Sequence, residues 1–294
     1  MFVILYLVEK RGNTMFNHSY ISEIGLKTAI DITGNRYSDS GMMWNELSIK
    51  TGIPRSIIER YDDWYILNNE FYFLKDRCII EELFMSELAN ECKVKCVEFL
   101  LASCDGNIGI MSKLYRDKNK EYYMYSDFCN KYFGGVPKSL EIFKFASFTK
   151  FGIERTERFM NDIFDLICLD ILSGQWDREE YNFFFECDMD NDIRIAPLCD
   201  NGAIFRKSFF YSFPFGELSL DEDRIYNGNL PYVLSCEKYF YNKLVLMLDI
   251  NIDEVLNRIS CKYNIIIDNN DRKRILGYFD NRKKMVDTTL RLVR

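Results

Sequence analysis

Three polar residues in the second half of the chain could together perform phosphate chemistry. Asp177 and Asn182 stand five positions apart in the segment 174–182, which reads Gly-Gln-Trp-Asp-Arg-Glu-Glu-Tyr-Asn, and Asp200 follows eighteen positions later. Phosphoryl transfer needs one carboxylate to orient the attacking hydroxyl and hard oxygen ligands to hold magnesium against the phosphates. Two aspartates and an asparagine supply these groups, provided that the fold brings them together.

The elements around these residues predict how they are brought together. Residues 153–173 form an apolar-rich pattern of helical period that ends at Gly174, and residues 183–186 and 193–198 read as two short strands. The polar stretch 188–192 between the strands is typical of a hairpin turn. The hairpin would return the chain so that Asp200 lies beside the loop that carries Asp177 and Asn182. Three further helices are expected over 235–249, 252–261 and 270–288.

The first part of the chain has a different character. Residues 63–67 and 70–75 predict a hairpin that turns at Asn68-Asn69, because Asn tolerates positive φ in such turns. A helix is expected over 78–91, and two strands over 94–102 and 107–115 joined at residues 104–107. We therefore expect an α+β protein of the protein-kinase type with two lobes. A small β-rich lobe would span 1–116, and a larger helical lobe with the catalytic loop would span 117–294.

The segment 174–182 resembles the catalytic loop of HipA-like kinases, which carries a Gly-x-x-Asp-Arg-x-x-x-Asn pattern. The stretch 195–200, Ile-Ala-Pro-Leu-Cys-Asp, is similar to the strand that precedes the metal-binding aspartate of the same family. The resemblance covers roughly residues 70–290. It implies that Asp177 is the catalytic base, that Asn182 and Asp200 bind Mg²⁺, and that the nucleotide is ATP.

The resemblance also assigns residues in the first lobe. Lys75 ends a strand as a phosphate-binding lysine does, and Glu82, with Glu81 as the alternative, resembles the helical glutamate that pairs with it. The adenine-facing hinge would lie near Lys113 and Leu114. The sequence departs from the family at Glu179, where a histidine is usual. The sequence also lacks a clear Gly-rich or Gln-Pro-Lys-type phosphate-binding loop in residues 1–70, where residues 34–41 are the only candidate.

Composition limits the other classes of function. The formal net charge is −7, so the chain as a whole does not favour a nucleic acid partner. The ten cysteines are scattered and His18 is the only histidine, which disfavours a zinc site or a disulfide framework and predicts reduced thiols. The apolar run 2–8 is too short to span a membrane and is read as a strand. A cytoplasmic protein without a membrane partner is expected.

One segment suggests another activity. Residues 45–60 resemble a helix-turn-helix whose first helix would end at Gly52 and whose second would begin at Pro54. A helix that reads DNA needs exposed basic and polar side chains, and here Arg55, Ser56 and Arg60 provide few of them. The role of residues 1–60 stays open between a DNA-binding segment and a helical pair that packs on the first lobe.

The sequence thus predicts a HipA-like, ATP- and Mg²⁺-dependent kinase that phosphorylates a Ser or Thr hydroxyl of a protein. The family includes toxins that pair with an antitoxin, so a regulatory partner of that kind is implied by the resemblance. Two alternatives remain. One is a pseudokinase or nucleotide-binding regulator, favoured by the departures described above, and the other is a DNA-binding regulator that uses residues 45–60.

Overall fold

The computed structural model describes residues 15–35, 45–46, 48–49, 64–68, 70–113, 119–176, 178, 184–190, 192–206, 209–211, 218–220 and 230–293. The chain forms two compact units that alternate along the sequence. Unit 1 contains residues 1–87, 97–116 and 252–276, and unit 2 contains residues 88–96, 117–251 and 277–294. The division into two lobes between residues 116 and 117 stays a prediction.

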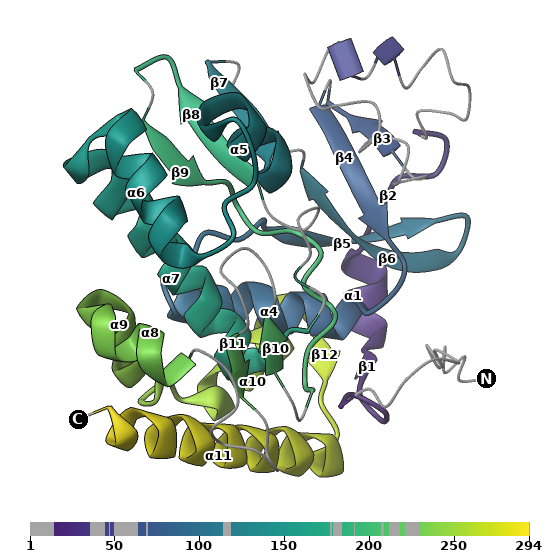
Figure 1. The fold of residues 1–294 in the computed structure, drawn as a ribbon. Coiled ribbons are helices and arrows are strands. Elements are labelled where there is room, and N and C mark those ends of the chain that lie inside the picture. The colour runs from purple at the N-terminus through teal and green to yellow at the C-terminus, as the bar shows by residue number, and fades with distance from the viewer. Residues whose placement is uncertain are drawn as a thin grey trace. The chain divides into compact units, whose positions relative to one another are not determined.

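A five-stranded sheet forms the centre of unit 1 (Figure 1). Its strand order is β2-β5-β6-β4-β3, and the strands are β2 (Ile30–Asp31), β3 (Trp64–Leu67), β4 (Glu70–Lys75), β5 (Phe99–Cys104) and β6 (Asn107–Lys113). All neighbours are antiparallel except β2 and β5, which are parallel. Residues Ile32, Tyr65, Ala102 and Met111 form a buried cluster on this sheet.

The two hairpins of this sheet confirm the sequence prediction. Asn68 has a φ of 52° in the turn between β3 and β4. Asp105 and Gly106 both have positive φ, 49° and 79°, and join β5 to β6 by the two-residue connection that suits the twist of paired strands. The strand expected to begin at residue 94 is wrong in its start, because β5 begins at Phe99. Lys95 instead accepts a backbone hydrogen bond from Leu198, and Cys96 forms an isolated parallel bridge with the same residue.

Helix α4 (Ile79–Glu91) confirms the helix expected over 78–91. Residues 79–89 are buried on every side of the helix, and they include three glutamates, Glu81, Glu82 and Glu87, among the apolar side chains. Unit 1 also contains α1 (Glu23–Thr28), α10 (Ile252–Tyr263) and the short strand pair β1 (Tyr20–Ile21) and β12 (Ile265–Ile266). Asp271, at the start of α11 (Asn269–Leu292), accepts hydrogen bonds from the His18 amide at 2.6 Å and the Ser19 hydroxyl at 2.9 Å.

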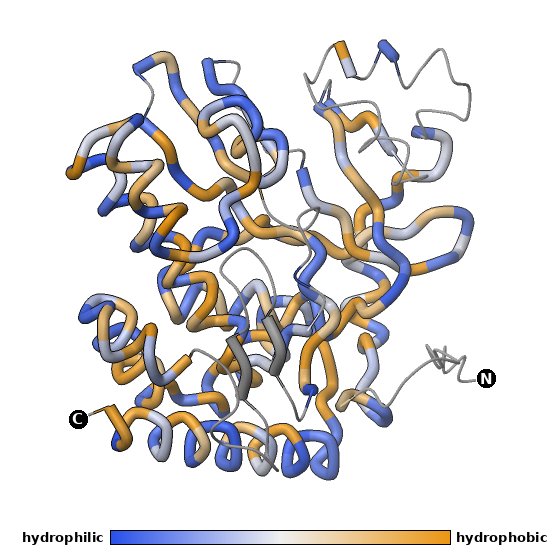
Figure 2. The backbone as a smooth tube through the Cα atoms, viewed as in Figure 1, coloured by the Kyte–Doolittle hydropathy of each residue, from blue (hydrophilic) through white to orange (hydrophobic). Residues whose placement is uncertain are grey.

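Unit 2 is built around α7 (Ile153–Ser173), which is almost wholly buried from residue 163 onward. Figure 2 shows the apolar residues that run along this helix. It packs against α6 (Leu140–Phe151), α9 (Lys238–Met247) and β9 (Ile193–Ile195). Strand β9 belongs to a three-stranded antiparallel sheet with β7 (Lys120–Met124) and β8 (Phe184–Asp188), and α5 (Tyr125–Phe133) contacts that sheet.

Aromatic side chains fill the core between these elements. The rings of Phe128 and Phe185 lie 4.3 Å apart, and Phe143 and Phe159 lie 5.7 Å apart. Each of these four rings is fully buried. Large buried rings in contact explain how the high aromatic content of the sequence contributes to stability.

The helices after residue 230 differ from the prediction. The helix expected over 235–249 is α9, which begins only at Lys238 because the chain breaks at Glu237, with φ −110° and ψ 88°, after the additional helix α8 (Leu230–Cys236). Helices α10 and α11 confirm the other two, although α11 extends to Leu292. Strands β10 (Phe209–Tyr211) and β11 (Leu218–Leu220) form a separate antiparallel pair.

Two predictions concern segments that the structure does not describe. The apolar run 2–8 lies outside the described residues, and so does the helix-turn-helix segment except for residues 45, 46, 48 and 49. Among the described residues, no helix combines the length and the apolar character that crossing a bilayer requires.

Gly174 confirms the predicted end of α7 and offers a test of the packing there. It has a φ of 66°, and a Cβ atom at this position would lie 2.7 Å from the Arg206 carbonyl oxygen. Gly134, at the end of α5, has a similar φ of 74° but nothing within 4 Å of the same position. We expect Gly134→Ala to lower the free energy of unfolding by about 1–2 kcal/mol, because of backbone strain alone.

Gly174→Ala should cost about 1–3 kcal/mol more than Gly134→Ala, because it adds overpacking to the same strain. Urea unfolding followed by circular dichroism measures both losses. Equal losses in the two variants would contradict the close packing of Gly174.

Candidate functional site

The residues expected to bind phosphate in unit 1 are in direct contact. Lys75 is the last residue of β4, and Glu82 lies in the first turn of α4. The Lys75 ammonium forms an ion pair with the Glu82 carboxylate. Glu82 rather than Glu81 is therefore the partner that the structure brings to Lys75.

Burial makes this ion pair a rigid connection between the strand and the helix. The Glu82 side chain is fully buried, and that of Lys75 is 18% exposed. A buried carboxylate is costly unless it is paired, so the pair resists being broken. Gly109 on β6 contributes to the position of Lys75, because a Cβ there would lie 2.6 Å from the Lys75 carbonyl oxygen. Only glycine lets the two strands approach so closely.

In unit 2, Asp200 lies two residues beyond Leu198, which pairs with the segment that contains Lys95 and Cys96. Leu198 donates its backbone amide to Lys95 at 2.9 Å and accepts a hydrogen bond from the Cys96 thiol at 3.3 Å. Asp200 then adopts a positive φ of 55°, which turns the chain sharply. This conformation is uncommon for residues other than glycine, although aspartate tolerates it better than most. The chain thus turns at Asp200 itself.

A buried arginine connects the candidate catalytic loop to the Asp200 loop. The Arg178 guanidinium donates to both carboxylate oxygens of Asp170, at 3.0 and 2.9 Å, and to the Asn201 side-chain oxygen at 2.8 Å. Asp170 and Arg178 have fully buried side chains. Burial raises the pKa of Asp170 above its usual range, while Arg178 opposes that rise.

Asn201 connects this cluster to a further segment of unit 2. The Asn201 amide nitrogen donates to the Cys96 sulfur at 3.5 Å, which ties the Asp200 loop to residues 93–96 as well. Arg178 therefore fixes three segments of unit 2 at one point, namely the end of α7, the loop after it and the residues that follow Asp200.

Backbone hydrogen bonds reinforce this arrangement. Trp176 donates to Ala203 at 3.2 Å, and Phe205 donates to Ser173 at 2.9 Å. The start of the loop after α7 therefore runs beside residues 203–205. The Tyr278 hydroxyl of α11 donates to the Arg206 carbonyl at 2.8 Å, so α11 also holds the segment that follows Phe205.

The remaining candidate residues are not all described. Asp177 and Asn182 lie outside the described residues, as does Leu114 of the expected hinge. Lys113 ends β6 and forms an ion pair with Glu70. Of the candidate phosphate loop over 34–41, only residues 34 and 35 are described.

The donor set around Asp200 suits a hard cation. Its carboxylate is half-buried, and the Gln175 amide nitrogen donates to its carbonyl oxygen at 3.4 Å. The side-chain oxygen of Gln175 is buried and has no hydrogen-bond partner among the described residues. Carboxylate and amide oxygens are the ligands that Mg²⁺ prefers, and it takes only a few of them from a protein. Asp200 supplies one carboxylate of this kind, although no group of three or more His, Cys, Asp or Glu side chains gathers among the described residues. Its role as a Mg²⁺ ligand stays a prediction.

Sequence reasoning did not assign a role to Asp170, Arg178 or Asn201. Arg178 and Asn201 each adjoin a candidate site residue, but nothing in their spacing shows that they touch. Asp170 carries a usable signal, because a carboxylate inside the apolar stretch 163–172 needs a buried partner.

The buried charges predict a large loss of stability when Arg178 is removed. Arg178→Met should lower the free energy of unfolding by about 3–5 kcal/mol, because it leaves the Asp170 carboxylate buried without a partner. Arg158→Met is the matched control. Its ion pair with Asp192, at 2.8 Å, is partly exposed, and such pairs contribute less than about 1 kcal/mol. Similar losses in the two variants, measured by denaturant unfolding, would contradict the structural role of Arg178.

Comparison with known proteins agrees with the kinase-like fold. A proinflammatory kinase of Helicobacter pylori, CtkA, superposes with a TM-score of 0.58 over 90% of this chain and 98% of its own, at 15% sequence identity. HipA of Shewanella oneidensis MR-1, solved with HipB and operator DNA, gives a TM-score of 0.43 over 77% of this chain and 57% of its own, at 9% identity. No family model and no curated protein matches the sequence.

CtkA is a kinase, and HipA belongs to a toxin–antitoxin system. The first of them carries the structural conclusion, because it covers nearly the whole of both chains. The chain has a mixed α+β fold of the kinase type.

Proposed function

We propose that this protein is a kinase that uses ATP and Mg²⁺ to phosphorylate a Ser or Thr hydroxyl of a protein. The observation that carries the proposal is the buried ion pair between Lys75 and Glu82, which joins a strand end to a helix. In protein kinases an ion pair of this kind must be in place for the lysine to hold the phosphates. The kinase-type fold is independent support.

The roles of the other residues follow from the chemistry. The oxygen of the acceptor hydroxyl would attack the γ-phosphorus, the bond to the β–γ bridging oxygen would break, and ADP would leave with that electron pair. Asp177 would accept the proton of the hydroxyl, which must lie within hydrogen-bond reach of it. Asn182 and Asp200 would bind Mg²⁺, which neutralises negative charge on the phosphates when it is present.

The buried cluster supports these assignments in unit 2. Arg178 is adjacent to Asp177 in sequence, and Asn201 is adjacent to Asp200. Because Arg178 donates to Asn201 at 2.8 Å, the neighbours of the two aspartates are joined directly. A fixed distance between base and metal ligand is what positional catalysis requires. The motif resemblance also keeps an antitoxin-type protein as a proposed regulatory partner.

The Asp177→Asn variant tests the proposed enzyme. The variant should bind ATP with Mg²⁺ nearly as the wild type does, because Lys75, Asn182 and Asp200 remain. It should transfer phosphate at least about a hundredfold more slowly, since the proton acceptor is lost. Transfer of labelled γ-phosphate to the protein itself, to peptides and to lysate proteins measures the difference.

The outcomes separate the alternatives. A variant that transfers phosphate at the wild-type rate would contradict the assignment of Asp177 as base. A wild type that binds ATP and transfers nothing to any of these acceptors would favour the pseudokinase, which the departures at Glu179 and in the phosphate loop also suggest. DNA binding through residues 45–60 remains a separate alternative, for which salt-sensitive binding to duplex DNA is the test.

A further inference from the structure

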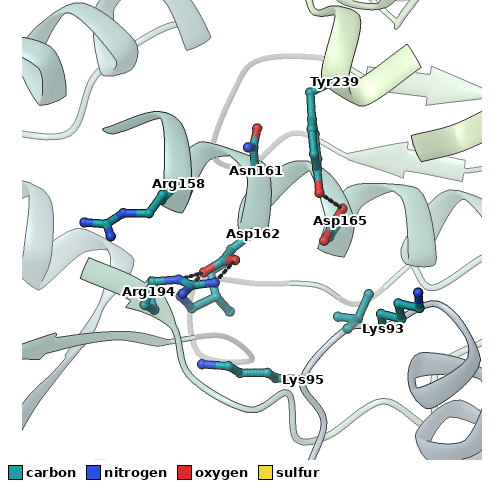
Figure 3. Close-up of a pocket in the computed structure, with 10 residues that line it drawn as sticks. Lys93, Lys95, Arg158, Asn161, Asp162, Asp165, Arg194 and Tyr239 are labelled. Atoms are coloured by element: carbon teal, nitrogen blue, oxygen red, sulfur yellow. Dashed lines mark hydrogen bonds and ion pairs between the residues drawn. The ribbon is translucent and has the colours of Figure 1, made fainter. Parts of the chain in front are cut away.

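A polar pocket in unit 2 lies apart from the residues assigned above. It has a volume of about 320 Å³, and its walls come from residues 93–95, α7, β9 and Tyr239. Figure 3 shows Asp162 held by Arg194 on one side of the pocket and Tyr239 directed at Asp165 on the other. Several charged groups gather here, so the question is which of them are still available to a ligand.

The acidic groups of the pocket are already neutralised. The Arg194 guanidinium donates to both oxygens of Asp162, at 2.6 and 2.7 Å. Asp165 accepts a hydrogen bond from the Tyr239 hydroxyl at 2.9 Å and pairs with Lys243 at 3.1 Å. Neither carboxylate is free to bind a cationic ligand.

The hydrogen-bond donors, in contrast, are partly unused. Lys93 has a φ of 57° and an exposed side chain that pairs with no acidic group among the described residues. The side chain of Asn161, on the opposite wall, likewise makes no hydrogen bond within the described part of the chain. Lys95 and Lys120 share a single oxygen of Glu186, at 3.2 and 3.0 Å. The capacity that remains is for an anionic acceptor such as a carboxylate.

The pocket shares lining residues with a second hollow, which shares others with a third and more apolar one, and the three together are called the groove. Asn161 and Tyr239 also line an adjoining hollow of about 290 Å³ beside Phe148. Phe148 in turn lines a third hollow of about 350 Å³ between α6 and α8. At this end Phe145 is 73% exposed and Tyr232 is 58% exposed, and both rings line the same hollow.

We propose that this groove docks an extended segment of a partner protein. The segment would place an acidic side chain against the exposed Lys93 ammonium, on the wall that also carries Lys95, and one or two bulky apolar side chains on Phe145 and Tyr232. Charge supports this polarity, because the chain carries a net charge of −7 and would repel acidic peptides elsewhere. Glu141, on the rim of the apolar end, disfavours a second acidic residue beside the apolar anchors.

The proposal deepens the proposed kinase function by identifying how a protein substrate or regulator is held. Docking nevertheless requires neither ATP nor phosphate transfer. The test is therefore binding without nucleotide, and its result does not depend on the catalytic assignment. The Asp177→Asn variant should bind the same peptides as the wild type.

A displayed library of random peptides about 12 residues long provides the probe. It is selected on the wild type and counter-selected on a Lys93→Glu/Lys95→Met variant. The methionine removes the charge but keeps the apolar stem, and Glu186 keeps Lys120 as its partner. We expect enriched sequences to combine an acidic residue with bulky apolar residues several positions away. Enrichment of basic sequences, or no enrichment over the variant, would overturn the proposal.

Fluorescence anisotropy of an enriched peptide then locates the two ends of the site. The Lys93→Glu/Lys95→Met and Phe145→Ser/Tyr232→Ser variants should each bind at least about tenfold more weakly, provided that circular dichroism shows them folded. Lys138→Glu and Leu246→Ser are the matched controls, since both residues are exposed in unit 2 and neither lines the groove. Equal losses in variants and controls would overturn the proposed position.

Discussion

The buried contact of Arg178 with Asp170 and Asn201 is the constraint on which the candidate site in unit 2 depends. Two fully buried charges are tolerated there only because their geometry is bidentate and the third hydrogen bond goes to an amide oxygen. This contact joins the end of α7 to the residues beside Asp177 and Asp200. The described neighbours of Asp177 and Asp200, namely Arg178 and Asn201, are thereby held to the buried end of α7.

Much of the architecture follows from local sequence signals. Asn68 and the pair Asp105-Gly106 have the positive φ values that their hairpins need, and Gly174 ends α7 where the apolar periodicity ends. The contact of Lys75 with Glu82 also matches the sequence prediction, since a strand end and the first turn of the next helix are close along the chain. Signals of this kind act within a few residues, which is why the sequence alone carries them.

Tertiary contacts account for what the sequence did not predict. The segment 94–98 has strand-like composition, yet Lys95 and Cys96 bond to Leu198, about a hundred residues away, rather than extending β5. The break at Glu237 between α8 and α9 likewise has no glycine or proline to mark it. The sequence did not predict the groove on unit 2 either, because its lining side chains come from segments far apart in the sequence.

The proposed kinase function requires that Asp200 binds the Mg²⁺ of a magnesium–nucleotide complex. Calorimetric titration of ATP, with and without Mg²⁺, into the wild type and a folded Asp200→Ala variant tests it most directly. We expect the wild type to bind ATP more tightly with Mg²⁺ than without it. The variant should lose this Mg²⁺-dependent part of the affinity for ATP. Unchanged affinity for ATP with Mg²⁺ in the variant would contradict it.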